Sequence, residues 1–61
     1  MNKEDMIEVG NEVLLDGAVW AVVEEVERLS LRVGNVLRDE FFVVDEDGAE
    51  HIVTSDRLDL V

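Results

Sequence analysis

Hydrophobic residues in this chain of 61 residues fall in short runs that are separated by turn-forming residues. The clearest run, LSLRV from Leu29 to Val33, alternates apolar with polar residues. Because successive side chains of a strand point to opposite faces of a sheet, such alternation predicts a strand with one apolar face. The other runs are rich in valine or aromatic residues, which are typical of strands. We therefore expect strands over residues 12–15, 18–27, 29–33, 41–44, 50–53 and 58–61.

Two Asp-Gly pairs, Asp16-Gly17 and Asp47-Gly48, each stand between two of these apolar runs. Asp-Gly in this setting is typical of a type I′ hairpin turn, in which both central residues have positive φ. Gly34-Asn35 is a third candidate turn. The sequence therefore predicts antiparallel strands joined by tight turns.

Residues 29–37 also fit a second interpretation. Leu29, Val33, Val36 and Leu37 have the i, i+4, i+7, i+8 spacing of an amphipathic helix. Gly34-Asn35 would lie in the middle of that helix and would weaken it. We prefer a strand, a turn and a second strand over this segment, with the helix as the alternative.

The length of the chain predicts one small domain, residues 1–61, in which residues 1–7 form a loose N-terminal tail. Domains of this size bury only about 60% of their unfolded surface, so many need a disulfide, a metal or a partner. Cysteine is absent, which excludes disulfides and thiolate metal sites. The chain has no apolar run of about 18 residues, which is the length that a membrane-spanning helix needs, so we expect no such helix. The acidic N-terminus does not resemble a signal peptide, so we expect a cytoplasmic protein.

Acidic residues outnumber basic residues by 16 to 5, which gives a formal net charge of −11. Such a charge repels the phosphates of nucleic acids and anionic membranes, so direct binding to either is disfavoured. The same charge favours a protein partner with a basic surface. Adaptation to a salt-rich environment stays an alternative explanation of the acidity.

Two motifs near the ends of the chain resemble the SH3-like small barrels, the group that includes KOW and Tudor-type domains. Val-Gly-Asn-Glu-Val at residues 9–13 is similar to the opening before their first hairpin. Thr-Ser-Asp-Arg at residues 54–57 is similar to the 3₁₀ turn before their last strand. The resemblance implies an all-β barrel of five to six short antiparallel strands, and closure of the sheet protects its edges. The resemblance implies the fold but does not identify a ligand. The negative charge of the chain opposes binding of nucleic acid. The aromatic cage of methyl-lysine-binding Tudor domains cannot be assigned to residues of this chain.

Four carboxylates crowd the predicted hairpin over residues 42–53. They are Asp45, Glu46, Asp47 and Glu50. An EF-hand loop with Gly48 at its sixth position would need ligands at Val43 and Thr54, so this calcium motif is excluded. A weaker metal site from Asp45, Asp47 and Glu50 is the alternative to a solvated turn. We prefer the turn, and we expect no metal or other cofactor.

His51 is the only histidine, and Ser55 and Asp56 follow it closely in the sequence. A Ser-His-Asp triad needs a cleft and an oxyanion hole. A barrel this small is filled by its own side chains and has little room for a cleft. We therefore expect His51 to be a half-exposed strand residue, and we expect the protein not to be an enzyme.

The aromatic residues raise the question of an interface. Trp20 shares one predicted strand face with Ala18 and Val22, yet the opposite face of that strand is also apolar. Phe41 and Phe42 are neighbours, so one should pack inward and the other should be exposed or at an interface. An exposed apolar patch rimmed by charge often marks a partner site. A bent strand that buries both faces in part is the alternative.

Residues 28–38 contain no acidic residue, and three of the four arginines lie there: Arg28, Arg32 and Arg38. They could neutralise acidic segments of the same chain, such as residues 24–27 or 39–40. They could instead contact the acidic tip of a second copy, which would make a homo-oligomer. A phosphate-binding strip is the third interpretation, and the overall field of the protein opposes it.

These features predict a non-enzymatic module that docks an acidic, partly apolar surface onto a protein partner. One version is a nucleic-acid mimic that blocks a basic groove, similar in composition to small acidic viral inhibitor proteins. The alternative is a structural or accessory subunit of a virion or larger complex, and a KOW-like nucleic-acid-binding barrel is the third. The residues expected to contact the partner are Trp20, Glu24, Glu25, Glu27, Phe41, Phe42, Asp45, Glu46, Asp47 and Glu50.

Overall fold

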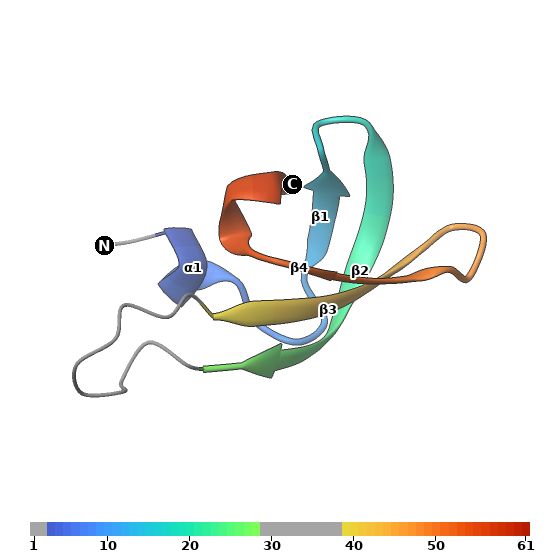
Figure 1. Ribbon diagram of the computed structural model, residues 1–61. Coiled ribbons are helices and arrows are strands. Elements are labelled where there is room, and N and C mark those ends of the chain that lie inside the picture. The colour runs from blue at the N-terminus through green and yellow to red at the C-terminus, as the bar shows by residue number, and fades with distance from the viewer. Residues whose placement is uncertain (1–2, 29–38) are drawn as a thin grey trace.

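A computed structural model describes residues 3–28 and 39–61, which form a five-stranded antiparallel sheet and two short helical turns (Figure 1). The elements are α1 (Lys3–Met6), β1 (Glu12–Leu15), β2 (Val19–Glu27), β3 (Glu40–Asp45), β4 (Glu50–Val53), the 3₁₀ helix η1 (Ser55–Arg57) and β5 (Leu58–Leu60). The strand order is β4-β3-β2-β1-β5. The all-β prediction is confirmed, and so is the 3₁₀ turn before the last strand. The strand predicted over residues 29–33 and its helical alternative lie outside the described residues.

Strand β2 holds the sheet together because it pairs with β1 along its first half and with β3 along most of its length. Its residues Val19–Val22 face β1, and the register with β3 runs from Ala21 to Glu27. A β-bulge interrupts this second register between Val23 and Glu25. Bulges bend a strand and increase its twist, and Figure 1 shows β2 curving from the β1 side of the molecule to the β3 side. The result is a small barrel-like sheet.

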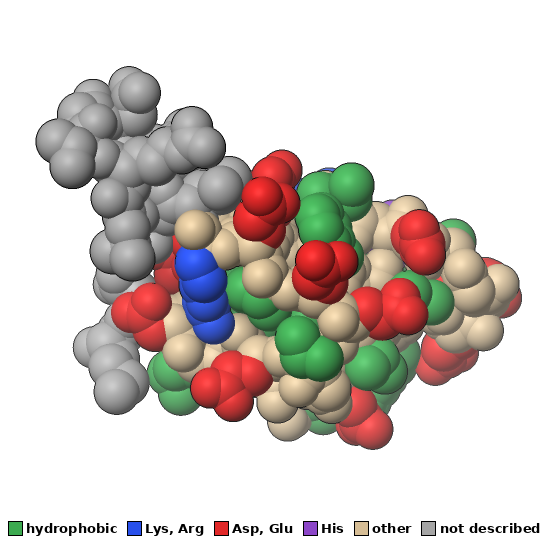
Figure 2. Space-filling model, turned by 90° about the horizontal axis from the view of Figure 1, so that it is seen from below, with side chains coloured by type: hydrophobic (Ala, Val, Ile, Leu, Met, Phe, Trp, Pro, Cys, Tyr) green, Lys and Arg blue, Asp and Glu red, His purple; other side chains and the backbone are tan. Residues whose placement is uncertain are grey.

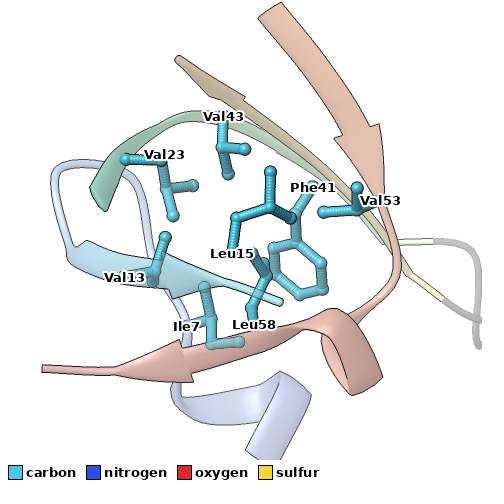
Figure 3. Close-up of a cluster of buried hydrophobic side chains, with 9 residues drawn as sticks. Ile7, Val13, Leu15, Val23, Phe41, Val43, Val53 and Leu58 are labelled. Carbon is cyan, nitrogen blue, oxygen red and sulfur yellow. The ribbon is translucent and has the colours of Figure 1, made fainter. Parts of the chain in front are cut away.

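Alternate residues of the strands build one buried core on the concave side of the sheet. Phe41, Ile7 and Leu58 are fully buried there, and in Figure 3 the labelled side chains converge on a common centre. The core residues are Ile7, Val13, Leu15, Ala21, Val23, Phe41, Val43, Val53 and Leu58. Most are β-branched or aromatic, which suits packing against a pleated surface.

The N-terminal segment differs from the predicted loose tail. Residues 3–6 form the helical turn α1, and the Ile7 side chain is fully buried in the core. Arg28 fixes this segment, because Nη1 donates to the carbonyl of Glu4 at 2.7 Å and Nη2 donates to that of Ile7 at 3.1 Å. Burial of the Ile7 side chain removes apolar surface from water, which favours this ordered arrangement of the segment.

Arg28 also neutralises the one charged side chain that is buried among the described residues. Its Nη1 lies 3.0 Å from Oδ2 of Asp39, and the Asp39 carboxylate is 1% exposed. The Arg28 guanidinium carbon lies 5.9 Å from the centre of the Phe41 ring. For Arg28, neutralisation within the same chain is therefore confirmed. Arg32 and Arg38 lie outside the described residues.

The two Asp-Gly turns have different geometries. Asp16 and Gly17 have φ values of 53° and 72°, which confirms the predicted type I′ turn. In the second hairpin Gly48 has a φ of 85°, but Asp47 does not have a positive φ. The Gly48 N–H donates to the Asp45 carbonyl at 3.0 Å, as in a three-residue loop that ends in a left-handed glycine. The type I′ prediction is therefore wrong for Asp47-Gly48.

Candidate functional site

The convex side of the sheet carries an apolar patch, here called the outer face, that no described residue covers fully. It consists of Trp20, Val22, Phe42, Val44 and Ile52. Val22 pairs with Val44 across β2 and β3, and Phe42 pairs with Ile52 across β3 and β4. Side chains directly opposite on one sheet face are neighbours, so these residues form a continuous patch. Trp20, Val22 and Ile52 are 43%, 44% and 64% exposed, while Phe42 and Val44 are half-buried.

Carboxylates edge the outer face on two sides. Glu24, Glu25 and Glu50 line a hollow of about 480 Å³ together with Phe42 and Ile52. A smaller hollow of about 180 Å³ has Glu12 and Glu46 at its border and Trp20, Val22 and Val44 on its apolar side. In the view of Figure 2, exposed hydrophobic side chains stand between acidic ones. The outer face therefore combines an apolar centre with an acidic rim.

The β-bulge explains how two successive glutamates reach the same hollow. In a regular strand Glu24 and Glu25 would point to opposite faces. The register skips Glu24, and Glu25 pairs with Phe42. Both glutamate side chains are exposed and both line the larger hollow. The bulge thus adds one carboxylate to the outer face.

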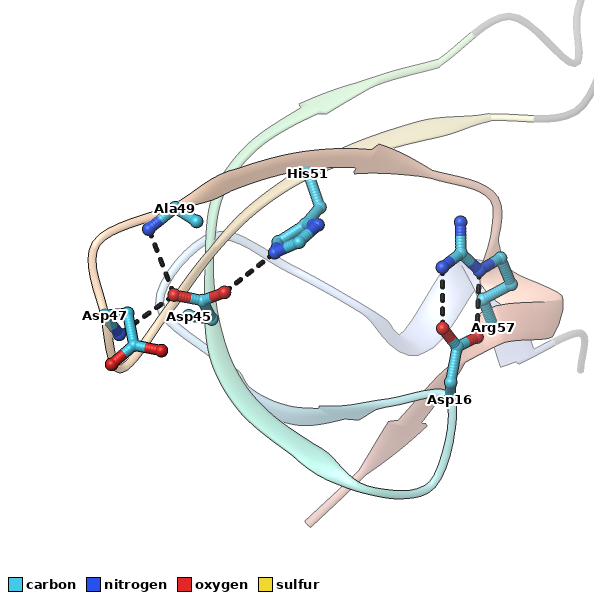
Figure 4. Close-up of polar contacts among 6 residues, drawn as sticks. All are labelled: Asp16, Asp45, Asp47, Ala49, His51 and Arg57. Atoms are coloured by element: carbon cyan, nitrogen blue, oxygen red, sulfur yellow. Dashed lines mark hydrogen bonds and ion pairs between the residues drawn. The ribbon is translucent and has the colours of Figure 1, made fainter.

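At the acidic tip, the Asp45 carboxylate is engaged in hydrogen bonds that stabilise the turn. Its Oδ1 accepts hydrogen bonds from the backbone N–H groups of Asp47 at 2.9 Å and Ala49 at 3.0 Å. Its Oδ2 lies 2.8 Å from His51 Nε2 (Figure 4). The bond to His51, followed by those from the backbone, lowers the pKa of Asp45. The Asp45 side chain is 12% exposed and its carboxylate is engaged within the chain, so the prediction that it contacts a partner stays a prediction.

The remaining residues predicted to contact a partner separate into different environments. Phe41 is fully buried in the core, so its assignment to a partner site is wrong, whereas Phe42 lies on the outer face. The prediction that one phenylalanine packs inward is confirmed. Asp47 is exposed at the hairpin tip, and Glu27 pairs with Glu40 at the far end of β2. Neither Asp47 nor Glu27 lines the two hollows described above.

The structure does not bring the candidate catalytic residues together as a triad. His51 is bonded to Asp45, while Asp56 accepts a hydrogen bond from the Thr54 hydroxyl. His51 is half-exposed, as predicted. Across residues 3–28 and 39–61, no cluster of three or more acidic or histidine side chains is arranged to hold a metal ion.

A second carboxylate-cation pair, drawn in Figure 4 apart from Asp45 and His51, joins the first hairpin to η1. Arg57 Nε and Nη2 donate to the two carboxylate oxygens of Asp16 at 2.8 and 2.6 Å. Arg57 lowers the pKa of Asp16 chiefly through this bidentate hydrogen bond. The pair links η1 to the first hairpin, and it engages the Arg57 guanidinium within the chain.

Comparisons of the chain with protein-family models, with curated proteins and with solved structures found no match. Among the described residues there is also no helix long and apolar enough to cross a membrane.

Sequence reasoning missed part of the candidate site. Val22, Val44 and Ile52 lie in predicted strands but are not among the predicted contact residues, although Ile52 is the most exposed member of the outer face. Two signals could have found the last two: Val44 stands two residues after Phe42, and Ile52 stands two residues after Glu50. Residues two apart in a strand lie on the same face of the sheet, so an exposed contact residue indicates that the residue two positions away is on the same surface.

Proposed function

We propose that this protein is a non-enzymatic binding module that docks its outer face onto a protein surface with basic groups around an apolar patch. The observation that carries the proposal is the continuous apolar row across β2, β3 and β4, which is exposed and edged by carboxylates. Single exposed hydrophobic residues are normal on soluble proteins. A continuous patch with a polar rim is instead the usual arrangement of an interface.

The energetics of the sheet support this interpretation. Val22, Val44 and Ile52 do not face the core, so polar β-branched residues such as threonine would serve the strand equally well. Their exposed apolar surface gains stability only when something covers it, at about 25 cal/mol per Å². A partner that covers this face would supply that gain.

The charge of the chain supports the choice of a basic partner. A net charge of magnitude about 2–8 is enough to keep a small domain soluble, and this chain carries −11. Opposite fields accelerate association and align the two surfaces. A nucleic-acid mimic that fills a basic groove is one version of the proposal, within the SH3-like architecture that the sequence resembles. The apolar centre of the outer face favours a partner that offers hydrophobic as well as basic groups.

The alternative is a structural or accessory subunit whose outer face is permanently covered. It rests on the same exposed apolar row, and salt distinguishes it, because burial of apolar surface is not weakened by screening. The third candidate, a KOW-like nucleic-acid-binding barrel, has less support. Arg28 and Arg57 are both engaged by aspartates of the same chain.

The test compares two matched double variants as immobilised baits in lysate of the source organism. Val22→Thr with Ile52→Thr alters the outer face, whereas Val9→Thr with Val61→Thr alters exposed valines outside it. Proteins retained by the wild type and by the control, but not by the outer-face variant, are then purified. Calorimetry should show that the outer-face variant binds such a protein at least about tenfold more weakly than the control does.

Two results would contradict the proposal. If the outer-face variant binds the purified protein as tightly as the control, the outer face is not the interface. If binding requires the outer face but is equally tight at low and high salt, the acidic rim plays no part. The structural-subunit alternative would then replace the proposal.

A further inference from the structure

The larger hollow on the outer face points to the group that it recognises. We propose that it receives an arginine side chain of the protein partner, an inference that rests on the proposed function. Its lining combines carboxylates from two strands with apolar and aromatic residues of β3 and β4, and it also includes His51. At about 480 Å³ the hollow falls within the size range of small-ligand pockets, roughly 300–1,000 Å³.

The positions of the carboxylates are set by the sheet and not by flexible loops. Glu24 and Glu25 come from the bulge in β2, and Glu50 comes from β4. Phe42 lies between them, because it pairs with Glu25 on one side and with Ile52 on the other. A side chain entering the hollow would therefore meet negative charge from both neighbouring strands and the Phe42 side chain that lines it.

The carboxylates of the hollow lack the cations that other carboxylates of the chain have. Asp16, Asp39 and Asp45 are each bonded to a basic side chain. Within the described part of the chain, the side chains of Glu24, Glu25 and Glu50 form no ion pair or hydrogen bond. Three nearby carboxylates repel one another, and a bound cation would remove that repulsion.

The inner face shows how this chain accommodates a guanidinium beside a phenylalanine. Arg28 lies over the Phe41 ring at 5.9 Å and contacts the Asp39 carboxylate at 3.0 Å. The next residue, Phe42, lies on the opposite face beside carboxylates, and the one histidine that lines the same hollow, His51, is bonded to Asp45. The outer hollow thus combines carboxylates with a phenylalanine, two of the kinds of group that contact Arg28 on the inner face.

Arginine suits these groups better than lysine does. A guanidinium is planar, stacks on an aromatic ring and pairs with a carboxylate through two hydrogen bonds. A lysine ammonium is more strongly hydrated and does not form the two parallel bonds. The aliphatic part of an arginine side chain would also cover the exposed Ile52 side chain.

The probe is a short blocked peptide with one arginine flanked by leucines, titrated into isotope-labelled protein and followed by amide NMR shifts. The same peptide with citrulline, which is neutral and nearly isosteric, or with lysine serves as the comparison. We expect saturable shifts centred on Glu24, Glu25, Phe42 and Glu50 with the arginine peptide. Affinity should fall at least about tenfold for citrulline and about threefold for lysine.

Two matched triple variants distinguish the effect of the carboxylates in the hollow from the effect of the net charge of the protein. Glu24→Gln, Glu25→Gln and Glu50→Gln should weaken arginine-peptide binding at least about tenfold. Asp5→Asn, Glu8→Gln and Asp47→Asn remove the same charge away from the hollow and should change binding less than about twofold. Circular dichroism should show that both triple variants keep the fold of the wild type.

Several results would overturn the proposal. Equal binding of the arginine and citrulline peptides, equal binding of arginine and lysine, or equal losses in the two triple variants would each do so. Shifts at the hollow that depend on protein concentration alone would show that a second copy fills it. If the hollow variant binds the natural partner normally while Val22→Thr with Ile52→Thr does not, the arginine site fails and the proposed function stands.

Discussion

The two faces of β2 and β3 are built from similar residues but have different surroundings. On the inner face Val23, Phe41 and Val43 are at most 1% exposed. On the outer face Val22, Phe42 and Val44 occupy the adjacent positions and keep contact with solvent. The strands therefore place nearly the same side chains in a core and on a surface.

This difference shows that hydrophobicity alone does not define the core of so small a sheet. The inner face is buried because Ile7, Leu15 and Leu58 lie against it (Figure 3). No described segment lies against the outer face in the same way. The inner residues are thus accounted for by folding, whereas the outer residues call for another explanation, and binding is the one that we propose.

The largest effect is expected from removing the Phe41 ring. Phe41→Ala should destabilise the protein by about 3–5 kcal/mol, because a buried phenylalanine leaves a cavity when truncated. Phe42→Ala should cost less than about 1 kcal/mol, because the outer face is not closed. Chemical denaturation followed by circular dichroism measures both. Similar losses for the two variants would show that the two faces are equally buried in solution.

The next effect concerns the ion pair that closes the inner face. Arg28→Met keeps much of the aliphatic stem but leaves Asp39 without this cation and leaves the Glu4 and Ile7 carbonyls without these donors. We expect a loss of about 2–4 kcal/mol, because removing one member of a pair with a buried charge is strongly destabilising. Arg57→Met breaks an exposed pair and should cost less. Thermal unfolding compares the two, and an equal loss would refute the role given to Arg28.

The five described strands and one of the two Asp-Gly turns follow from local patterns, which is why the sequence predicts them closely. The second turn does not, because the Asp45 side chain satisfies the N–H groups of Asp47 and Ala49 and so selects another loop. Alternation places Phe41 and Phe42 on opposite faces but does not say which one is inside. That choice depends on packing against Ile7 and other distant residues, which no local pattern contains.

The candidate site was predictable in part. A count of carboxylates identifies the β3–β4 hairpin as acidic, but it does not show that Asp45 is already bonded to His51. It also does not show that a bulge turns Glu24 and Glu25 to one side. The first feature is a contact between two side chains and the second is a backbone irregularity, and neither can be read from the number of acidic residues.

A smaller effect, limited to acidic solution, is expected at Asp45. Its pKa is lowered in the folded protein, mainly by His51, so its charged form stabilises the fold above the pKa of the unfolded chain. That contribution is lost as the pH falls through the folded pKa, below about pH 4. Asp45→Asn should therefore be less stable than the wild type at pH 6, and the difference should disappear in acid. Asp47→Asn, which changes an exposed neighbour, should show no such convergence, and convergence in both variants would remove Asp45 from this role.

The smallest effect is expected for Val22→Thr. Its comparison with Val23→Thr is the most direct comparison of the two faces, because adjacent residues receive the same substitution. Val23→Thr places a hydroxyl in the core and should cost about 1–3 kcal/mol, since that hydroxyl is buried without an assured partner. Val22→Thr places it on the outer face, where threonine suits a strand and water can bond to it, so the change should lie within about 0.5 kcal/mol. Denaturant unfolding at two protein concentrations measures both. If Val22→Thr is destabilising only at the higher concentration, a second copy covers the outer face, because association stabilises a fold by mass action. If it is neutral at both, Val22 contributes nothing measurable to folding, and the apolar character of the outer face requires a partner to explain it.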